Sequence, residues 1–269
     1  MFKTPIFKGS CTAIVTPFND NGIDFDKMAE LIDYQYDNGT AALVVCGTTG
    51  ENATMSRYEH EELIEFVCRH NDGRMKIIAG IGSNDTTKAL GFAKCALRCD
   101  ADGVLMVTPY YNKATQSGLV RHFTYVADRV DIPMIVYNVP SRTSIGIRLE
   151  TYVELSKHPN INGVKEASGD FSLFAATRAE CGNDLFIWSG NDDQIVDILE
   201  RGGKGVISVL SNVCPQETHD IVAKYLNGDV DGSKALMDHY FELAKTLFCD
   251  VNPIPVKDAV NRIGYAAGP

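Results

Sequence analysis

Eight short apolar runs, separated by longer amphipathic stretches, constrain the fold of this chain more than any other feature of its sequence. The runs are rich in β-branched residues and continuously apolar, as are strands buried on both faces. They occupy 11–16 (CTAIVT), 42–46 (ALVVC), 76–81 (KIIAGI), 103–108 (GVLMVT), 133–137 (PMIVY), 161–165 (INGVK), 185–189 (LFIWS) and 205–210 (GVISVL). Eight strand–helix repeats predict parallel strands with right-handed crossovers, closed into a (β/α)8 TIM barrel. A doubly wound open sheet is the structural alternative.

The helix-like stretches begin at residues that can cap a helix. They run over 56–70 from Ser56, 85–99 from Asp85, 117–129 from Ser117, 170–180 from Asp170 and 192–200 from Asp192. Two more helices, 215–227 and 230–248, follow the eighth run. We therefore expect a barrel through strand eight in residues 1–214. Residues 215–269 should supply the last barrel helix and a C-terminal helical appendage of the same structural unit.

The charge balance narrows the range of partners. The net charge is −10 and the isoelectric point is about 5.0, which argues against a nucleic-acid partner and against binding to an anionic membrane. The overall field would also not attract an anionic substrate. A carboxylate substrate would therefore have to be held by a few local cations.

The eight cysteines show no metal-ligand spacing. They stand at 11, 46, 68, 95, 99, 181, 214 and 249, without a C-x-x-C pair or an accompanying histidine cluster, so we expect neither a zinc site nor another metal. The first residues lack the apolar run of a signal peptide, and no apolar stretch is long enough to span a membrane. We expect a cytoplasmic protein with reduced thiols.

Polar side chains cluster where the predicted strands end. In a (β/α)8 barrel the chemistry lies at the C-terminal ends of the strands. Those ends carry CGTTGE (46–51), TPYYN (108–112), YNVPSRT (137–143), VKEA (164–167) and SGND (189–192). Hydroxyls, phenols, a guanidinium and an amine should therefore converge on one face.

Lys165 is the decisive residue of this set. Alternation along a strand sends Lys165 and Glu166 to opposite sides. A lysine inside the barrel mouth would be desolvated, which lowers its pKa and exposes a nucleophilic amine. A lysine that extends from the strand end into solvent is an equal alternative on position alone. Since no metal site is visible, a carbonyl substrate would need covalent activation by an amine, and this favours a Schiff base.

The neighbouring groups suit that chemistry. Tyr137 and Tyr111 can supply phenolic O–H groups and Thr48 can bridge them, while Thr49 can bind a small carboxylate and Arg142 a second one. Each has a simpler explanation, such as a rim tyrosine, ordinary turn chemistry or a surface ion pair. Only their joint placement on one face favours catalysis.

Five segments resemble the dihydrodipicolinate synthase family of the class I pyruvate aldolase and lyase superfamily. They are GTTGE (47–51), TPYYNKATQ (108–116), YNVPSRT (137–143), GVKEASGD (163–170) and GVISVLSN (205–212), in the family's order along essentially the whole chain. The resemblance implies that Lys165 forms an imine with pyruvate and that the derived enamine attacks aspartate 4-semialdehyde. The product would be 4-hydroxy-tetrahydrodipicolinate, the first committed step toward diaminopimelate and lysine.

The resemblance also assigns roles to residues. Tyr137 would shuttle protons, with Thr48 and Tyr111 completing the relay and Tyr111 reaching across a dimer interface. Thr49 would hold the pyruvate carboxylate and Arg142 the semialdehyde carboxylate. Gly190 and the Ile207 carbonyl would line the pocket. No metal or organic cofactor is implied, and the implied assembly is a homotetramer built as a dimer of dimers.

Three departures from the family pattern accompany these matches. Ser144 stands where the family usually has glycine, and relatives are expected to continue for about a helix beyond Pro269. The third concerns inhibition by lysine, whose positions in regulated relatives match Asn52, Ala53, Arg57, His60, Asn84, Lys88 and Tyr110. Arg57 and Lys88 add cations that would repel a cationic ligand, so we expect weak or absent lysine inhibition. From the sequence alone, His60 is interpreted as a solvated helix residue.

Two alternatives remain open at this stage. N-acetylneuraminate lyase and 2-keto-3-deoxy sugar-acid aldolases share the Schiff-base lysine and the tyrosine, but the doubled threonine of GTTGE and Arg142 fit a small dicarboxylate product better. A non-catalytic binding or regulatory protein on the same fold is the alternative from a different class.

Overall fold

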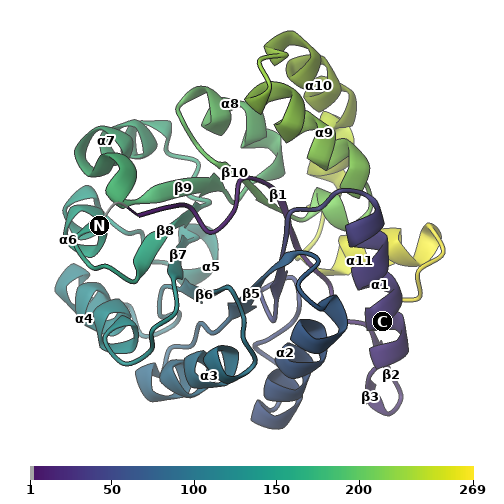
Figure 1. Cartoon of the computed structure of the whole chain (residues 1–269), viewed down its shortest axis with the longest axis horizontal. Coiled ribbons are helices and arrows are strands. Elements are labelled where there is room, and N and C mark those ends of the chain that lie inside the picture. The colour runs from purple at the N-terminus through teal and green to yellow at the C-terminus, as the bar shows by residue number, and fades with distance from the viewer. Residues whose placement is uncertain (1–2) are drawn as a thin grey trace.

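The computed structural model describes residues 3–269, and its centre is a closed ring of eight parallel strands (Figure 1). Around the ring the order is β1-β10-β9-β8-β7-β6-β5-β4, with β1 closing the barrel between β10 and β4. The strands are β1 (Gly9–Ala13), β4 (Ala42–Val45), β5 (Lys76–Gly80), β6 (Gly103–Val107), β7 (Met134–Asn138), β8 (Ile161–Glu166), β9 (Phe186–Ser189) and β10 (Gly205–Ser208). The predicted (β/α)8 barrel is therefore confirmed.

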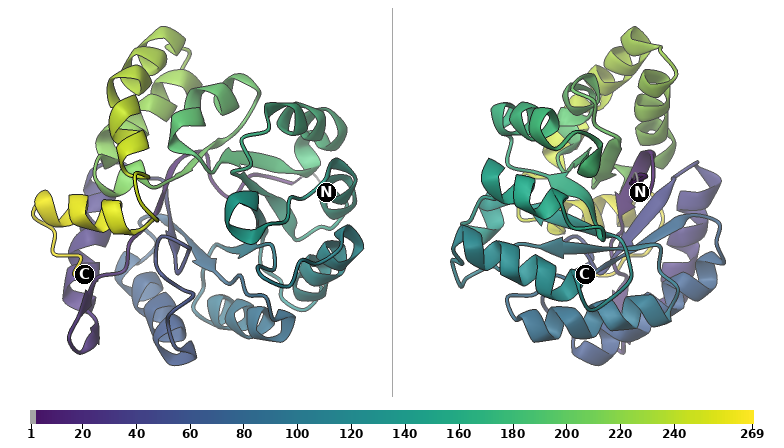
Figure 2. Two further views of the ribbon diagram at one scale, coloured as in Figure 1. Left: turned by 180° about the vertical axis from the view of Figure 1, so that it is seen from behind. Right: turned by 60° about the vertical axis from the view of Figure 1, so that its left-hand side comes forward.

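Helices follow the strands, and most of them surround the ring on its outer side, as both views of Figure 2 show. They are α1 (Phe25–Asp37), α2 (Arg57–Asn71), α3 (Thr86–Arg98), α4 (Gln116–Ala127), α5 (Pro140–Thr143), α6 (Leu149–Ser156), α7 (Phe171–Cys181), α8 (Ile195–Glu200), α9 (Pro215–Leu226), α10 (Val230–Thr246) and α11 (Ile254–Arg262). Three short 3-10 turns are η1 (Gly182–Asp184), η2 (Asp192–Gln194) and η3 (Leu210–Asn212), and β2 (Phe18–Asn19) pairs with β3 (Gly22–Ile23) in a small hairpin. No helix of the described residues is long and apolar enough to cross a membrane.

Most predicted caps are observed. Ser56 forms a full capping box with Glu59 at the start of α2. Two predicted starts are wrong. Thr115, not Ser117, caps α4, because its hydroxyl accepts a hydrogen bond from the Gly118 N–H.

Asp192 is the second wrong start. It begins the 3-10 turn η2 instead of capping an α-helix. Its carboxylate turns inward and accepts hydrogen bonds from the main-chain N–H groups of Val209 (3.0 Å) and Leu210 (2.9 Å). Asp192 therefore fixes the segment that follows β10.

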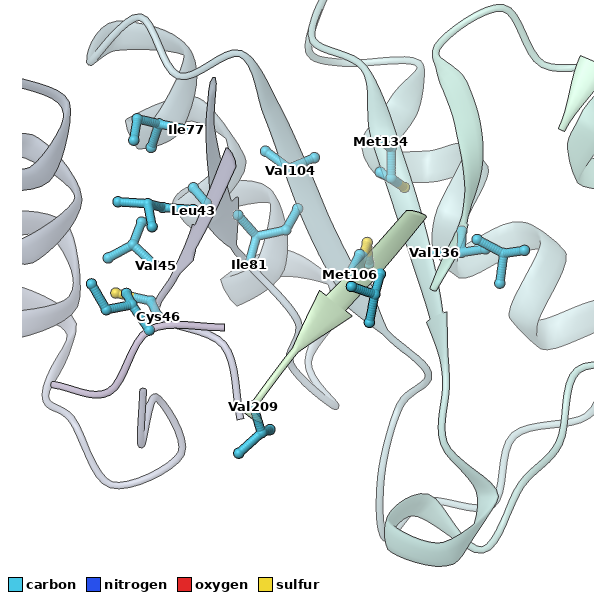
Figure 3. Packing of buried hydrophobic residues seen from close by; sticks show 14 of the residues in the cluster. Leu43, Val45, Cys46, Ile77, Ile81, Val104, Met106, Met134, Val136 and Val209 are labelled. Carbon is cyan, nitrogen blue, oxygen red and sulfur yellow. The ribbon is translucent and has the colours of Figure 1, made fainter. Parts of the chain in front are cut away.

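Two apolar clusters explain why the strands read as continuous apolar runs. The larger cluster lies between the strands and the helices, and Figure 3 shows members such as Leu43, Val45, Met106 and Val136. The smaller cluster fills the barrel interior, where Phe7 stacks on Trp188 with ring centroids 5.0 Å apart. Because side chains alternate along a strand, six of the eight strands (β4, β5, β6, β7, β9 and β10) contribute to both clusters.

The C-terminal segment lies against the start of the chain. In Figure 1 the yellow helix α11 is close to α1. The rings of Tyr34 and Tyr265 stack at 4.5 Å, and the Phe18 N–H donates to the Ala267 carbonyl. This placement brings the segment between α10 and α11 to the barrel mouth, where it contributes to the cavity described below.

Candidate active site

A cavity of about 400 Å³ opens at the C-terminal ends of the strands. Its size suits a small ligand. The predicted residues Thr48, Thr49, Tyr137, Arg142, Lys165 and Gly190 all line it. The rule that the chemistry of such barrels lies at the strand ends thus selects side chains that share one cavity.

Lys165 and Tyr137 face each other across neighbouring strands. Tyr137 on β7 and Lys165 on β8 are register partners, and the lysine Nζ lies 4.5 Å from the centre of the tyrosine ring. Lys165 is only 5% exposed, so its amine is held inside the barrel and does not extend into solvent.

Burial changes the pKa values of both groups. Desolvation lowers the pKa of Lys165 to about 8, although Cys11 and Asp192 act in the opposite direction. Burial raises the pKa of Tyr137 to about 12. Near neutral pH, part of the Lys165 population is therefore a neutral nucleophile, while Tyr137 keeps the proton that a donor needs.

The carboxyl neighbour of the lysine lies on the other face of β8. Glu166 is buried and accepts hydrogen bonds from the Tyr152 hydroxyl (2.7 Å), the Asn138 amide (3.1 Å) and the Ser168 N–H (2.8 Å). Asn138 also accepts from the Ile147 N–H (3.1 Å). This network ties β7 and β8 together directly behind the Tyr137–Lys165 pair.

The two expected carboxylate-binding groups lie on different loops. Thr49 is buried in the loop after β4, and Arg142 lies in the short helix α5 after β7. Ser144 ends α5 in the left-handed region with φ of 57°. A glycine would adopt that conformation without strain, so the glycine expected at this position from the resemblance would suit the backbone found here.

Gly190 lines the cavity where a larger residue would not fit. A Cβ placed there would lie 2.7 Å from the Ala167 Cβ and 3.2 Å from the Lys165 Cε. Ile207 is buried inside the barrel on β10. The cavity itself is lined by Val209, two residues further along the chain.

Tyr111 is not brought to this cavity by its own chain. Its side chain is 90% exposed, and its backbone has a φ of 70°. Tyr110 instead lines an adjoining cavity of about 240 Å³, together with Asn52, Ala53 and Thr48.

The remaining residues of the expected lysine site cluster near the starts of α2 and α3. His60 is 1% exposed, and its Nε2 lies 2.7 Å from the Gly80 carbonyl oxygen. Its ring stacks on Phe92 with centroids 3.8 Å apart. Burial lowers the pKa of His60 to about 4. The interpretation of His60 as a solvated residue is wrong, because its ring is buried: Nε2 hydrogen-bonds a strand carbonyl, and Nδ1 is buried without a partner among the described residues.

Several groups at the mouth could not be placed from strand-end patterns. Asn252, Asp250 and Phe248 line the cavity from the segment between α10 and α11. Residues 3–269 contain no cluster of three or more His, Cys, Asp or Glu side chains suited to a metal ion, and all eight cysteines are free thiols.

Comparison with known proteins supports this description. Residues 6–269 match the Dihydrodipicolinate synthetase family. A 4-hydroxy-tetrahydrodipicolinate synthase of Caldicellulosiruptor saccharolyticus is 52% identical over 265 residues, which cover 98% of this chain and 90% of that protein. The corresponding synthase of Thermoanaerobacter sp. (strain X514) is 49% identical over 266 residues, with the same coverage. The crystal structure of dihydrodipicolinate synthase from Thermotoga maritima superposes with a TM-score of 0.94 at 41% identity, covering 97% of this chain and 90% of that one. The chain belongs to the dihydrodipicolinate synthase family.

Proposed function

We propose that this chain is a Schiff-base lyase that condenses pyruvate with L-aspartate 4-semialdehyde to give 4-hydroxy-tetrahydrodipicolinate. The observation that supports it most strongly is the buried Lys165 amine, whose pKa falls to about 8 at the floor of a cavity lined by hydroxyl and guanidinium groups. Membership of the family supplies the substrates.

The reaction follows from the placement of the amine. The neutral Lys165 amine attacks the C2 carbonyl of pyruvate, and loss of water gives an imine. Loss of a C3 proton gives an enamine, whose C3 forms a carbon–carbon bond with the aldehyde carbon of the semialdehyde. The amino group of the semialdehyde then attacks C2, which closes the ring and releases the Lys165 amine.

The surrounding residues take the roles that this sequence of steps requires. Tyr137, whose ring centre lies 4.5 Å from the amine, donates and accepts the protons, and Thr48 on the same cavity wall relays them. Thr49 binds the pyruvate carboxylate, and Arg142 binds the carboxylate of the semialdehyde nearer the mouth. Gly190 leaves room beside the lysine, and we propose that the Ile207 carbonyl contributes to the pocket wall.

Tyr111 completes the relay only if a second copy of the chain brings it to the cavity. Its exposure on a single chain agrees with a place at an interface. We propose a homodimer that supplies Tyr111 to the neighbouring site, assembled further into a tetramer. We also propose that residues 215–269 form one unit with the barrel and that the protein works in the cytoplasm.

Trapping with borohydride tests the central claim. The protein is incubated with pyruvate, reduced, digested and examined for a pyruvate adduct on the peptide that contains Lys165. Lys165→Ala should abolish trapping and turnover, while Lys94→Ala, which removes an exposed amine on α3, should change neither. Trapping in the Lys165→Ala protein would refute the assignment.

A substrate comparison tests the choice within the superfamily. Pyruvate with aspartate 4-semialdehyde should turn over, whereas sialic acid and 2-keto-3-deoxy sugar acids should not be cleaved. Preferential cleavage of sialic acid would overturn the proposed substrate pair.

Weak or absent inhibition by lysine remains our prediction. The Arg57 guanidinium lies 2.7 Å from the Glu61 carboxylate, which offsets part of its repulsion of a cation. Lys88 lies 5.8 Å above the Phe92 ring, near the expected site. A lysine titration of the condensation rate tests this, and strong inhibition below about millimolar lysine would contradict the electrostatic argument.

A further inference from the structure

The segment between α10 and α11 reaches the cavity from the far end of the chain. Its Asn252 is 6% exposed and lies within hydrogen-bonding distance of both expected carboxylate-binding residues. The Asn252 side-chain amide donates to the Thr49 hydroxyl oxygen at 3.0 Å. The Asn252 main-chain carbonyl accepts from the Arg142 guanidinium at 3.1 Å. One residue thus joins two loops that the barrel holds on different strands.

The segment is anchored firmly enough to act in this way. Lys257 in α11 is 4% exposed, and its Nζ forms an ion pair with Glu51 at 2.8 Å. The same ammonium group lies 5.0 Å from the Phe18 ring centre. Glu51 lies two residues after Thr49 in the same loop, so the ion pair and the Asn252 bond connect the same two segments. This half-buried ion pair therefore joins α11 to the loop that carries Thr49.

The direction of the Asn252–Thr49 bond has a chemical consequence. A hydroxyl carries one hydrogen and can accept through its lone pairs. When the amide N–H occupies a lone pair of the Thr49 oxygen, the hydroxyl hydrogen must point away from Asn252. The opposite amide orientation would place the N–H₂ group where the Asn252 Oδ1 now lies without a partner. That orientation would leave both amide hydrogens without a partner, whereas the observed one pairs one of them with the Thr49 oxygen.

We propose that Asn252 is a positioning residue for pyruvate binding, because it forces the Thr49 hydroxyl to donate its hydrogen into the cavity, toward the pyruvate carboxylate. Through its main-chain carbonyl it also holds the Arg142 guanidinium at the mouth. Asn252 acts through Thr49 and need not touch the reacting atoms. This inference rests on the proposed function and adds a C-terminal residue to the substrate-binding machinery.

A double-mutant cycle on pyruvate binding tests the proposal. The measured quantity is the pyruvate concentration that gives half-maximal borohydride trapping, which needs no semialdehyde. Asn252→Ala should raise this concentration about 3- to 10-fold, and Thr49→Val about 10-fold or more, as expected for a hydrogen bond to a charged group. In the Thr49→Val background, Asn252→Ala should add little, because the hydroxyl it orients is gone.

A second variant and a matched control keep the test decisive. Asn252→Asp keeps the shape of the side chain but can only accept from Thr49, so it should raise the half-saturating pyruvate concentration more than Asn252→Ala does. Asn261→Ala removes an asparagine of α11 whose amide hydrogen-bonds only within the C-terminal segment, to Gly268 and Ala267. It should lower the melting temperature without changing half-saturation.

The outcomes separate this inference from the proposed function. If wild-type protein traps pyruvate but the Asn252 variants keep its half-saturation, Asn252 has no positioning role. Equal fold-changes of Asn252→Ala with and without the Thr49 hydroxyl would also overturn the proposal, since the two residues would then act independently. If wild-type protein does not trap pyruvate at all, the proposed function itself fails.

Discussion

Replacing Lys165 with methionine should stabilise the folded protein, because the barrel holds this amine in a site that disfavours its charge. Burial lowers the pKa of Lys165 from 10.5 to about 8. Since one pKa unit corresponds to about 1.4 kcal/mol, the charged form is disfavoured by about 3 kcal/mol in the folded state. Methionine is of similar length and carries no charge, so Lys165→Met should recover much of this free energy of unfolding.

The two pKa values of Lys165 determine how the stability gain of Lys165→Met changes with pH. The folded-state pKa lies below the unfolded one, so the destabilising effect is complete below about pH 8 and disappears as the pH rises past the unfolded value. The gain from Lys165→Met should therefore be about 3 kcal/mol near pH 7 and about 1.5 kcal/mol near pH 9.5. The Lys165 contribution to the wild-type free energy of unfolding rises with pH over this interval, because at this group the unfolded state binds more protons.

Urea denaturation of both proteins, at one protein concentration and at both pH values, measures the effect. Other titrating groups cancel in the difference between the two proteins. Lys94→Met, at an exposed site on α3, is the matched control and should change the free energy of unfolding by less than about 0.5 kcal/mol at either pH. A Lys165→Met protein that is no more stable than wild type, or whose gain is the same at both pH values, would refute the reasoning.

Three further perturbations test other parts of the site. The rate of pyruvate trapping should rise with pH and level off above about pH 8, as the Lys165 amine loses its proton, and a rate that is independent of pH would contradict the lowered pKa. Gly190→Ala should slow trapping, with an overpacking cost of about 1–3 kcal/mol, because the added Cβ would meet Ala167 and the lysine stem; unchanged trapping would show that the cavity wall yields. Tyr152→Phe should lower the free energy of unfolding by about 1.5–3 kcal/mol in urea denaturation, because the Glu166 carboxylate loses its 2.7 Å hydroxyl donor, and an unchanged value would show that the other donors compensate.

The strands could be predicted from the sequence because the barrel buries both of their faces. Every apolar run coincides with a barrel strand to within about two residues at its start, since a strand covered by helices outside and by side chains inside leaves little room for polar residues. Helix α1 was not among the predicted helices, although Asp24 caps it and Met28, Leu31 and Ile32 are buried at helical spacing. Its polar composition masks that periodicity.

The sequence predicts only those residues of the site that stand at or just after the ends of strands. Lys165, Tyr137 and Thr49 come directly at or after strand ends, so the general geometry of the barrel places them together. Asn252 follows no strand, and its partner Thr49 is 203 positions away in the sequence. Such a contact depends on how the C-terminal helices pack, which no local pattern encodes. The same holds for His60, whose burial depends on a carbonyl of the neighbouring strand.

The way the ring closes has a kinetic consequence. Strand β1 pairs with β10, so residues 9–12 meet residues 205–208, and contacts of such large sequence separation form late because the intervening chain must first be ordered. We expect the amine of Lys165 to stay in water, with the reactivity of an ordinary surface lysine, until that pairing encloses the cavity. Pyruvate and borohydride added during refolding would therefore label only molecules whose ring has closed, and the growth of the adduct would time the last step of barrel assembly.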